Sequence, residues 1–412
     1  MKSENLFLPF FLFIFTILCG MTQPAIAQTE PKNKNAAYYF DKGEEAISSK
    51  SYKTALAHFN ECLRLSPYFM EAYYSRAITK ENLGDKQGAL TDYNIYLEAK
   101  PDSKEALFSR AMTRYEYGQW AVAKEDFLKL LALPKGGETN TIYFQTDKSA
   151  DGVTKAFTVQ NNMSATYLNY LGLIETNLND FSKAAHYFDS AISINPNDPD
   201  FLINRGVMRL TAGDSLPARA DFEKALLINP ESSLARHNLA VIKKYSAKFE
   251  ETEAMLTESI EKNPAMPYSY AERGLVRMKN GNMKGAMEDY NEAIRLNPSD
   301  PDYWLNRGII KEKSKNLSGA LADYEQVIAL KADHEKGWLN HGNVLVKLDR
   351  FTEAIEDYSV AITYYPDYGL AYYNRGLTLH RLGKKTEACK DLNRAKELGI
   401  KIDQKIVSTI CK

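Results

Sequence analysis

Apolar and small residues recur along this chain with the spacing of amphipathic helices. In residues 267–300, Tyr270 and Gly274 lie four positions apart, and Ala286, Tyr290 and Ala293 follow the i, i+4, i+7 spacing of a second helical face. Residues at these spacings share one side of a helix. The segment therefore predicts two helices, each of which buries one face.

Turn residues separate the predicted helices, and the whole pattern repeats every 34 residues. Asn280-Gly281-Asn282 ends the first helix, and Asn297-Pro298 ends the second. With each copy numbered from position 1 to position 34, ten copies begin at Ala36, Met70, Lys104, Ala165, Pro199, Ser233, Pro267, Pro301, Glu335 and Gly369. Copies 1 to 3 and copies 4 to 10 are contiguous, so the sequence indicates a tandem array of one structural unit.

Small residues occupy two fixed positions of the unit. Position 8 is glycine or alanine in every copy, and position 20 is alanine in every copy except at Thr252. Helix axes approach closely only where no bulky side chain separates them, and an aromatic residue at position 24 of most copies fills the adjacent space. Together with alanine at position 27 and proline at position 32, this pattern resembles the tetratricopeptide repeat.

The resemblance implies an all-α fold. We expect a right-handed α-solenoid of about ten helix-turn-helix units, in which each unit mainly contacts its neighbours. The expected organisation is a signal peptide in residues 1–27, repeats 1–3 in residues 36–134, an inserted β-hairpin in residues 135–164, repeats 4–10 in residues 165–402 and a C-terminal capping helix in residues 403–412.

Position 7 departs from the family pattern, in which leucine is frequent. Six copies carry arginine there, and each of them has aspartate sixteen residues later. Because a guanidinium can bind a carboxylate through two hydrogen bonds, we predict an ion pair between the two helices of each such repeat. The regular recurrence of these acids favours a structural role over a catalytic one. The predicted pairs are Arg76–Asp92, Arg110–Asp126, Arg205–Asp221, Arg273–Asp289, Arg307–Asp323 and Arg375–Asp391.

The N-terminal segment has the layout of a secretory signal peptide. Lys2 precedes an apolar run in residues 6–18, and Ala25-Ile26-Ala27 provides a cleavage site after Ala27. We expect export to the bacterial periplasm, with secretion or association with the outer membrane as alternatives, and no transmembrane span in the mature chain. Lipidation at Cys19 stays open, although Leu18 stands where a lipobox has a small residue.

Two cysteines bracket a short amphipathic segment at the C-terminal end. Ile402, Ile406 and Ile410 follow i, i+4, i+8 spacing between Cys389 and Cys411. This spacing predicts a helix that covers the open face of the last repeat. A disulfide between the two cysteines would hold that helix in place, and an oxidising compartment permits the bond.

Charge and motifs exclude several function classes. The chain has 52 Lys and Arg against 53 Asp and Glu, so no general attraction to nucleic acid follows. It contains no H-E-x-x-H, no C-x-x-C and no EF-hand loop, so we expect neither a metal site nor a cofactor.

An insertion of 27 residues, 138–164, separates copies three and four. Two stretches rich in β-branched and aromatic residues flank the turn pair Asp151-Gly152, which predicts a β-hairpin. Tyr143, Phe144 and Phe157 would be costly to leave in water, which favours contact with a partner. A tolerated surface insertion, with the three rings packed on adjacent helices, is the alternative.

In proteins that this chain resembles, the first helix of each repeat lines a groove, and positions 2, 5, 9, 12 and 13 face a bound peptide. The resemblance implies apolar groove residues at Ile203, Val207, Leu275, Leu305, Ile309, Tyr373 and Leu377, and cations at Lys279, Lys313, Lys347 and Arg381. Such a surface suits an extended or helical segment with apolar anchors and some acidic groups. The alternative is that the cations only solvate helix ends.

The predicted function is a non-catalytic scaffold or adaptor that binds a partner protein or peptide. A structural envelope component that tethers several proteins is the alternative, and it differs in the number and permanence of its partners. An enzyme is disfavoured, because the segments left after these assignments are too short to build a separate catalytic core.

Overall fold

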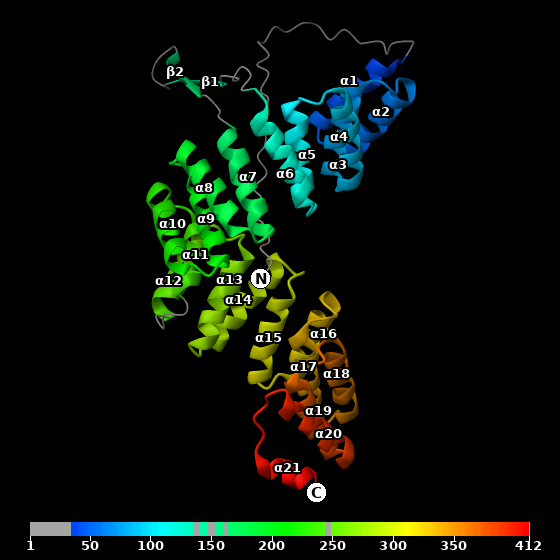
Figure 1. Ribbon diagram of the computed structural model, residues 1–412, viewed down its shortest axis with the longest axis vertical. Coiled ribbons are helices and arrows are strands. Elements are labelled where there is room, and N and C mark those ends of the chain that lie inside the picture. The colour runs from blue at the N-terminus through cyan, green and yellow to red at the C-terminus, as the bar shows by residue number, and fades with distance from the viewer. Residues whose placement is uncertain (1–33, 135–140, 147–152, 160–162, 244–248, 412) are drawn as a thin grey trace. The chain divides into compact units, whose positions relative to one another are not determined.

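The computed structural model describes residues 34–134, 141–146, 153–159, 163–243 and 249–411 (Figure 1). Within these ranges the chain forms twenty-one helices and two strands. The predicted signal peptide and Cys19 lie outside the described residues. None of the described helices is long and apolar enough to cross a membrane.

Twenty of the helices form ten consecutive pairs, one pair for each predicted repeat. The pairs are α1 (Ala36–Ser48) with α2 (Tyr52–Leu65), α3 (Met70–Asn82) with α4 (Lys86–Ala99), α5 (Lys104–Glu116) with α6 (Trp120–Ala132), α7 (Ser164–Asn177) with α8 (Phe181–Ile194), α9 (Pro199–Thr211) with α10 (Ser215–Ile228), α11 (Ser233–Lys243) with α12 (Phe249–Lys262), α13 (Pro267–Lys279) with α14 (Met283–Leu296), α15 (Pro301–Lys313) with α16 (Leu317–Leu330), α17 (Glu335–Lys347) with α18 (Phe351–Tyr364), and α19 (Gly369–Arg381) with α20 (Lys385–Glu397). The last helix, α21 (Gln404–Ile410), follows the tenth pair.

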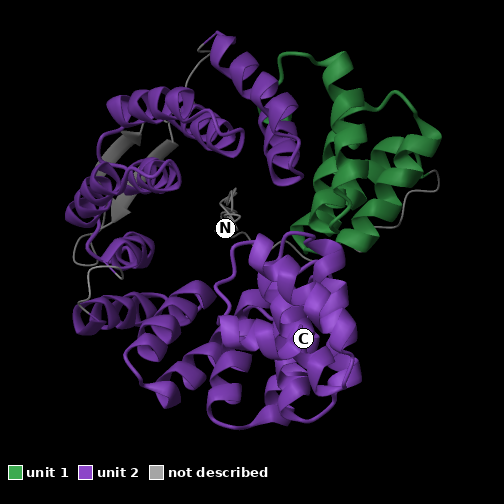
Figure 2. Ribbon diagram, turned by 60° about the horizontal axis from the view of Figure 1, so that its bottom comes forward, with its two compact units in different colours: residues 1–106 green, residues 107–412 purple. Residues whose placement is uncertain are grey.

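The chain divides into two compact units, residues 1–106 and residues 107–412 (Figure 2). In the first unit, α1 to α4 pack in chain order, each helix against the next. In the second unit, α6 to α20 do the same. Each unit is therefore built from contacts between helices that are close in sequence, as expected for a repeat array.

Glycine at position 8 allows the two helices of a repeat to approach each other. A Cβ atom added to Gly206 would lie 2.6 Å from a ring carbon of Phe222, and one added to Gly308 would lie 2.6 Å from a ring carbon of Tyr324. Both rings are fully buried. The aromatic residue at position 24 thus fills the space above the small residue sixteen positions earlier, which is the packing that the sequence pattern requires.

A left-handed residue at position 15 reverses the chain between the two helices. Glycine occupies this conformation in Gly213 and Gly281, but Lys315 adopts it with φ of 63° and Asp349 with φ of 57°. Directly after the turn, Asn316 caps α16 by accepting a hydrogen bond from the backbone N–H of Gly319. The turn and the cap together fix where the second helix begins.

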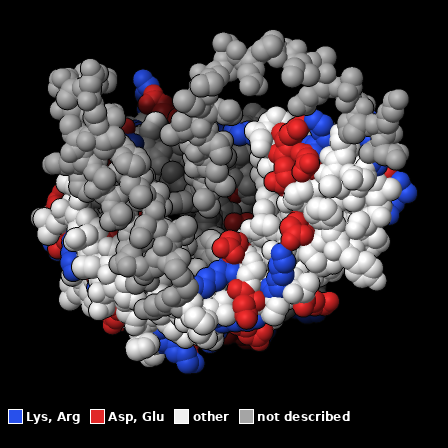
Figure 3. All heavy atoms as spheres, turned by 90° about the horizontal axis from the view of Figure 1, so that it is seen from above, with Lys and Arg blue, Asp and Glu red and all other residues white. Residues whose placement is uncertain are grey.

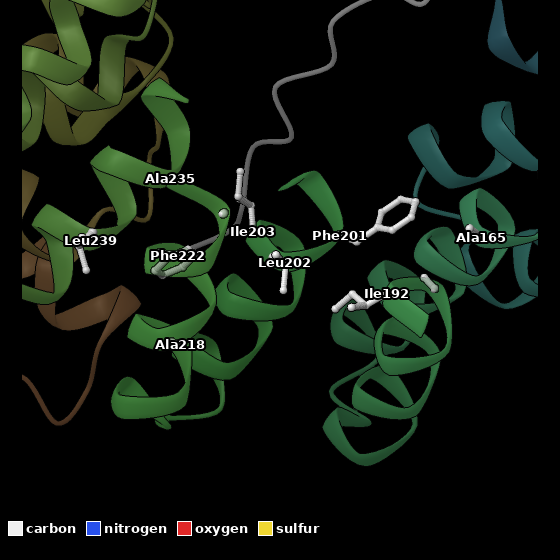
Figure 4. Packing of buried hydrophobic residues seen from close by; sticks show 11 residues of the cluster. Ala165, Ile192, Phe201, Leu202, Ile203, Ala218, Phe222, Ala235 and Leu239 are labelled. Atoms are coloured by element: carbon white, nitrogen blue, oxygen red, sulfur yellow. The ribbon is translucent and has the colours of Figure 1, made fainter. Parts of the chain in front are cut away.

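The hydrophobic core continues from one repeat to the next (Figure 4). One cluster joins Ala165 of repeat 4, Ile203 and Phe222 of repeat 5, and Ala235 and Leu239 of repeat 6. Each helix pair alone would expose an apolar face, and the neighbouring pair covers it.

The insertion does not interrupt the packing of repeats 3 and 4. Helix α7 packs against α6 as later repeats pack against their predecessors. The rings of Phe127 and Tyr170 are stacked with centroids 5.3 Å apart, and Lys124 Nζ lies 2.5 Å from Glu175 Oε1, a carboxylate that is almost fully buried. The inserted residues therefore leave and rejoin a continuous helical stack.

Two strands occupy the inserted segment, β1 (Thr141–Thr146) and β2 (Val153–Val159). They pair in antiparallel register, with Tyr143 opposite Phe157 and Phe144 opposite Ala156. Residues 147–152, which include the predicted Asp151-Gly152 turn, lie outside the described residues. The contact that Tyr143, Phe144 and Phe157 were expected to make with a partner stays a prediction.

The C-terminal segment covers the end of the array. Ile410 is buried in a cluster with Leu379 and Leu392 of repeat 10, and Ile402 and Ile406 pack against the same cluster. A disulfide joins Cys389 on α20 to Cys411, with Cα atoms 5.1 Å apart. The apolar face of repeat 10 is thus covered by α21 and the residues that precede it.

Candidate functional site

Arginine at position 7 and aspartate at position 23 meet between the two helices of their repeat. In repeat 5, Arg205 donates from Nε and Nη2 to the two carboxylate oxygens of Asp221, at 3.0 Å and 2.6 Å. The structure brings all six predicted pairs together, with Nη2 to Oδ1 distances between 2.6 and 2.9 Å. The carboxylates are buried and the guanidinium groups are mostly shielded from solvent.

A second cation binds five of these aspartates, and the sequence analysis missed it. It lies at position 11, one helical turn after the arginine, so both cations project toward the same carboxylate. The signal was present in the sequence as a Lys or Arg four residues after each of these arginines. The pairs are Lys80–Asp92, Arg114–Asp126, Arg209–Asp221, Arg277–Asp289 and Lys311–Asp323, at 2.7 to 3.0 Å.

Five of the six position-7 arginines also bind the preceding repeat through their Nη1 atoms. The acceptor lies sixteen residues before the arginine, at position 25, so each arginine stands midway between an acceptor and its aspartate. The acceptor varies chemically, which explains why no residue pattern revealed it. The bonds are Arg76 to Asn60, Arg205 to Asp189, Arg273 to Thr257, Arg307 to Asn291 and Arg375 to Ser359, at 2.5 to 3.0 Å.

These ion pairs have a structural character. Burial raises the pKa of Asp289, while the guanidinium groups of Arg273 and Arg277 oppose that rise. The hydrogen bond to Asp391 raises the pKa of Arg375. Each carboxylate is buried and is bound by at least one cation of its own repeat, and perturbed acids of this kind arise in structural networks.

The predicted groove residues at position 5 are more deeply buried than those at position 9 in repeats 5 and 8. Ile203 and Leu305 are only 2% and 5% exposed and belong to the core, as Figure 4 shows for Ile203. The prediction that these two face a ligand is therefore wrong, because the spacing of apolar residues gives the face of a helix but not the depth of burial. At position 9, Val207, Leu275 and Ile309 are half-buried and keep part of their surface accessible.

In repeat 10, both predicted apolar groove residues lie near the C-terminal cap. Tyr373 and Leu377 are half-buried against the cluster that contains Leu392 and Ile410. The cap therefore limits how much of this last apolar surface a ligand could reach.

The four predicted cations have different surroundings. Lys347 Nζ lies 2.6 Å from Glu312 Oε1, and Glu312 also accepts a hydrogen bond from the hydroxyl of buried Tyr324. The guanidinium of Arg381 lies over the ring of Phe351, 5.6 Å from its centroid. Lys279 and Lys313 are exposed. The apolar groove residue Leu275 therefore has Lys279 one turn along its own helix, and Ile309 has Lys313 in the same place.

The described residues contain no candidate metal site, and the face drawn in Figure 3 carries no surface of a single charge sign. Among the described residues, no group of His, Cys, Asp or Glu could hold a metal ion. On the face drawn in Figure 3, basic and acidic side chains are interspersed. This mixture fits the near-zero net charge.

Sequence comparisons give matches to five segments of the chain. A TPR repeat model matches residues 274–315 and 342–383, and tetratricopeptide repeat models match residues 165–198, 36–69 and 370–398. An uncharacterized protein of Methanocaldococcus jannaschii is 33% identical over 51 residues, which span 12% of this chain and 59% of that protein.

Three solved structures show similar folds. PilF of Pseudomonas aeruginosa is 18% identical over 49% of this chain and 91% of its own, with a TM-score of 0.45. YrrB, described as a TPR protein with an unusual peptide-binding site, is 22% identical over 48% of this chain and 99% of its own, with a TM-score of 0.39. The Cut9–Hcn1 structure is 12% identical over 91% of this chain and 95% of that chain, with a TM-score of 0.45. At these values the likenesses carry no statement about function.

Proposed function

Because tetratricopeptide repeats are present in this chain, we propose that the protein is a non-catalytic adaptor that binds a peptide segment or partner protein on the first helices of its repeats. The observation that carries the proposal is the recurrence of half-buried aliphatic residues at position 9, represented by Val207, Leu275 and Ile309. Partly exposed apolar residues at a fixed spacing offer anchor points for a ligand.

The ligand has apolar side chains with an acidic group beside them. Lys279 and Lys313 are exposed and lie one helical turn from Leu275 and Ile309. An acidic group placed there would be attracted electrostatically, which favours specificity and rate of association more than affinity. Lys347 contributes less, since Glu312 already neutralises it.

Crosslinking and pull-down from the native source tests this proposal. The variant Lys279→Glu/Lys313→Glu should lose a specific partner that the wild type captures, with helicity and melting unchanged. The matched control is Lys224→Glu/Lys284→Glu, which reverses two exposed lysines on second helices. Equal capture of the partner by the wild type, the variant and the control would argue against binding on the first helices.

A structural assembly component that tethers several proteins is the second candidate. Leu216 and Leu227 on α10, a second helix, are 80% and 84% exposed and lie eleven residues apart on one helical face. This surface is distinct from the position-9 residues, and two surfaces could hold two partners. Replacing both leucines with serine should then remove a partner that the lysine variant retains.

Export of the protein is also part of the proposal. The signal-like segment 1–27 and the Cys389–Cys411 disulfide support it, since such bonds persist in oxidising compartments. N-terminal sequencing of the native protein should place its first residue at Gln28. Thiol counting on the denatured, oxidised mature chain should find Cys62 free and the other two cysteines joined.

A further inference from the structure

Repeat 9 carries histidine where six other repeats carry arginine. His341 lies at position 7, and its Nδ1 atom is 2.6 Å from Oδ2 of the buried Asp357, sixteen residues later. Its Nε2 atom is 3.8 Å from Oε1 of Glu325, sixteen residues earlier. The histidine therefore stands between two carboxylates at the positions that flank each arginine.

Repeat 5 shows the same arrangement with a permanent charge. Arg205 lies between Asp189 and Asp221, at 2.5 Å and 2.6 Å, so it binds an acid on each side. A guanidinium donates to both at any pH found in a cell, whereas a neutral imidazole has a single N–H. The same site filled by histidine can complete both bonds only in its charged form.

The ring nitrogen that faces Glu325 has no hydrogen-bond partner. His341 Nε2 is a buried atom without a donor or acceptor among the described residues. With the ring proton on Nδ1 donated to Asp357, the Nε2 lone pair points toward a carboxylate and cannot bond to it. Protonation would convert this nitrogen into a donor beside an acceptor.

We infer that His341 is a pH-sensitive clasp between repeats 8 and 9. When the imidazole is protonated, it binds Glu325 on α16 as well as Asp357 on α18, and it ties the two repeats together. When it is neutral, only the bond within repeat 9 remains. The added contact exists only in the charged form, so its stabilisation is present while the imidazole is charged and is lost when the imidazole is neutral.

Other charged groups near this junction have ion-pair partners of their own. Glu353 on α18 is bound by Arg350, which has Nε and Nη2 at 2.7 Å and 2.5 Å from its carboxylate. On α19, Arg375 is bound to Asp391, 2.7 Å away. On α15, Asp302 lies 3.4 Å from His334. Glu325 and Asp357 are the acids within 4 Å of His341. The charge of His341 also acts on Glu353, and the charge of Arg350 acts on Glu325 and Asp357.

His334 is a second histidine near this junction, and its own interactions also depend on its charge. Its Nδ1 accepts a hydrogen bond from the backbone N–H of Gly337 and caps α17. Protonation of Nδ1 would abolish that acceptor. The variant His334→Asn retains a capping side chain and does not titrate, so it provides the background for the test.

Hydrogen exchange of α16 and α17 in the full chain, corrected for the intrinsic effect of pH, measures the clasp directly. In the His334→Asn background, exchange should be about two- to five-fold slower near pH 5.5 than near pH 7.5, as for one partly exposed ion pair. Glu325→Gln, at a side chain that is 58% exposed, should remove most of this difference. His341→Arg should give the slow rate at both pH values.

The inference would be overturned if Glu325→Gln left the pH dependence of hydrogen exchange unchanged. It would also be overturned if the His334→Asn background protein showed no pH dependence. Nitrogen NMR of the His341 ring provides an independent readout. The Nε2 signal should change to that of a protonated nitrogen as the pH falls to about 5.5. A ring that stays neutral over this range would also overturn the inference.

Discussion

Repeats 5 and 6 are neighbours in one hydrophobic core and use opposite chemistry at the same two positions. In repeat 5, Arg205 and Asp221 form an enclosed ion pair, with Arg209 as the second cation. In repeat 6 the equivalent residues are Leu239, which is buried, and Met255, which packs against the same cluster. The helix pair forms in both cases, so the pairing of the two helices does not require the ion pair, which is one of two ways to fill this space.

Repeat 6 has buried polar residues at its junction with repeat 7. Ser269 bonds to His237 Nδ1 at 3.0 Å and to the hydroxyl of Ser259 at 3.2 Å, and Ser259 donates to the carbonyl of Ser233. This chain joins α11, α12 and α13. The polar chain therefore links repeat 6 to repeat 7, a junction at which Arg273 also donates to Thr257.

The largest effect should come from Asp221→Asn in repeat 5. It leaves Arg205 and Arg209 enclosed without their carboxylate, which should lower the free energy of unfolding by about 3 kcal/mol. Urea unfolding monitored together with hydrogen exchange of α9 and α10 measures it, since repeat arrays need not unfold in one step. Asp189→Asn, at a side chain that is 57% exposed, is the control and should cost less than about 1 kcal/mol. Equal effects of the two would refute the enclosed-pair interpretation.

Gly206→Ala should cost about 1 to 3 kcal/mol, because its Cβ would meet the Phe222 ring. Repeat 6 has Ala240 and Leu256 at the corresponding positions. The double variant Gly206→Ala/Phe222→Leu should therefore be more stable than the sum of the two single changes predicts. A double-mutant cycle from thermal or urea unfolding gives this coupling. Strict additivity would show that the two positions do not share one space.

Ser269→Ala should lower the stability of repeats 6 and 7 by about 1 kcal/mol, because His237 loses a hydrogen bond inside the core. The change is expected in the exchange of α11 and α13. Ser318→Ala, at an exposed serine of α16, is the matched control. No difference between the two variants would mean that the polar chain does not stabilise repeat 6.

The smallest effect is expected when repeat 6 receives the chemistry of repeat 5. Leu239→Arg/Met255→Asp should change stability by less than about 1 kcal/mol, because enclosed ion pairs and apolar contacts of similar volume are close in free energy. Either single change should cost more than the double change, since it leaves one enclosed charge unpaired. Urea unfolding of the three variants measures the coupling, and a double variant that is worse than both singles would contradict it.

Much of the fold could be predicted from the sequence, because repetition multiplies weak signals. Positions 8, 20 and 24 recur in phase, and the first helices begin where the pattern places them, except that α7 begins one residue early. The Arg205–Asp221 type of pair was visible as two residue types sixteen positions apart. The contacts of these arginines with the preceding repeat were not visible, because their acceptors share no side-chain class. Examples are Asn60, Asp189 and Thr257.

The candidate site was less predictable, for physical reasons. Helical spacing identifies the face on which Ile203 and Val207 lie, but only packing decides that Ile203 is buried and Val207 is not. Likewise Lys313 and Lys347 occupy equivalent positions, yet Lys347 is bound by Glu312 from the preceding repeat. The sequence pattern of one repeat does not show which residue of a neighbouring repeat will form an ion pair with its lysine.

The sixteen-residue spacing on both sides of each arginine bears on how the chain could change its length. Deleting residues 267–300 would leave Arg307 sixteen positions after Thr257, which is the acceptor now used by Arg273. Arg307 would keep Asp323 and would meet Thr257 in place of Asn291. Loss of a whole unit therefore leaves this arginine with a hydrogen-bond acceptor on one side and its aspartate on the other, whereas loss of part of a unit would not.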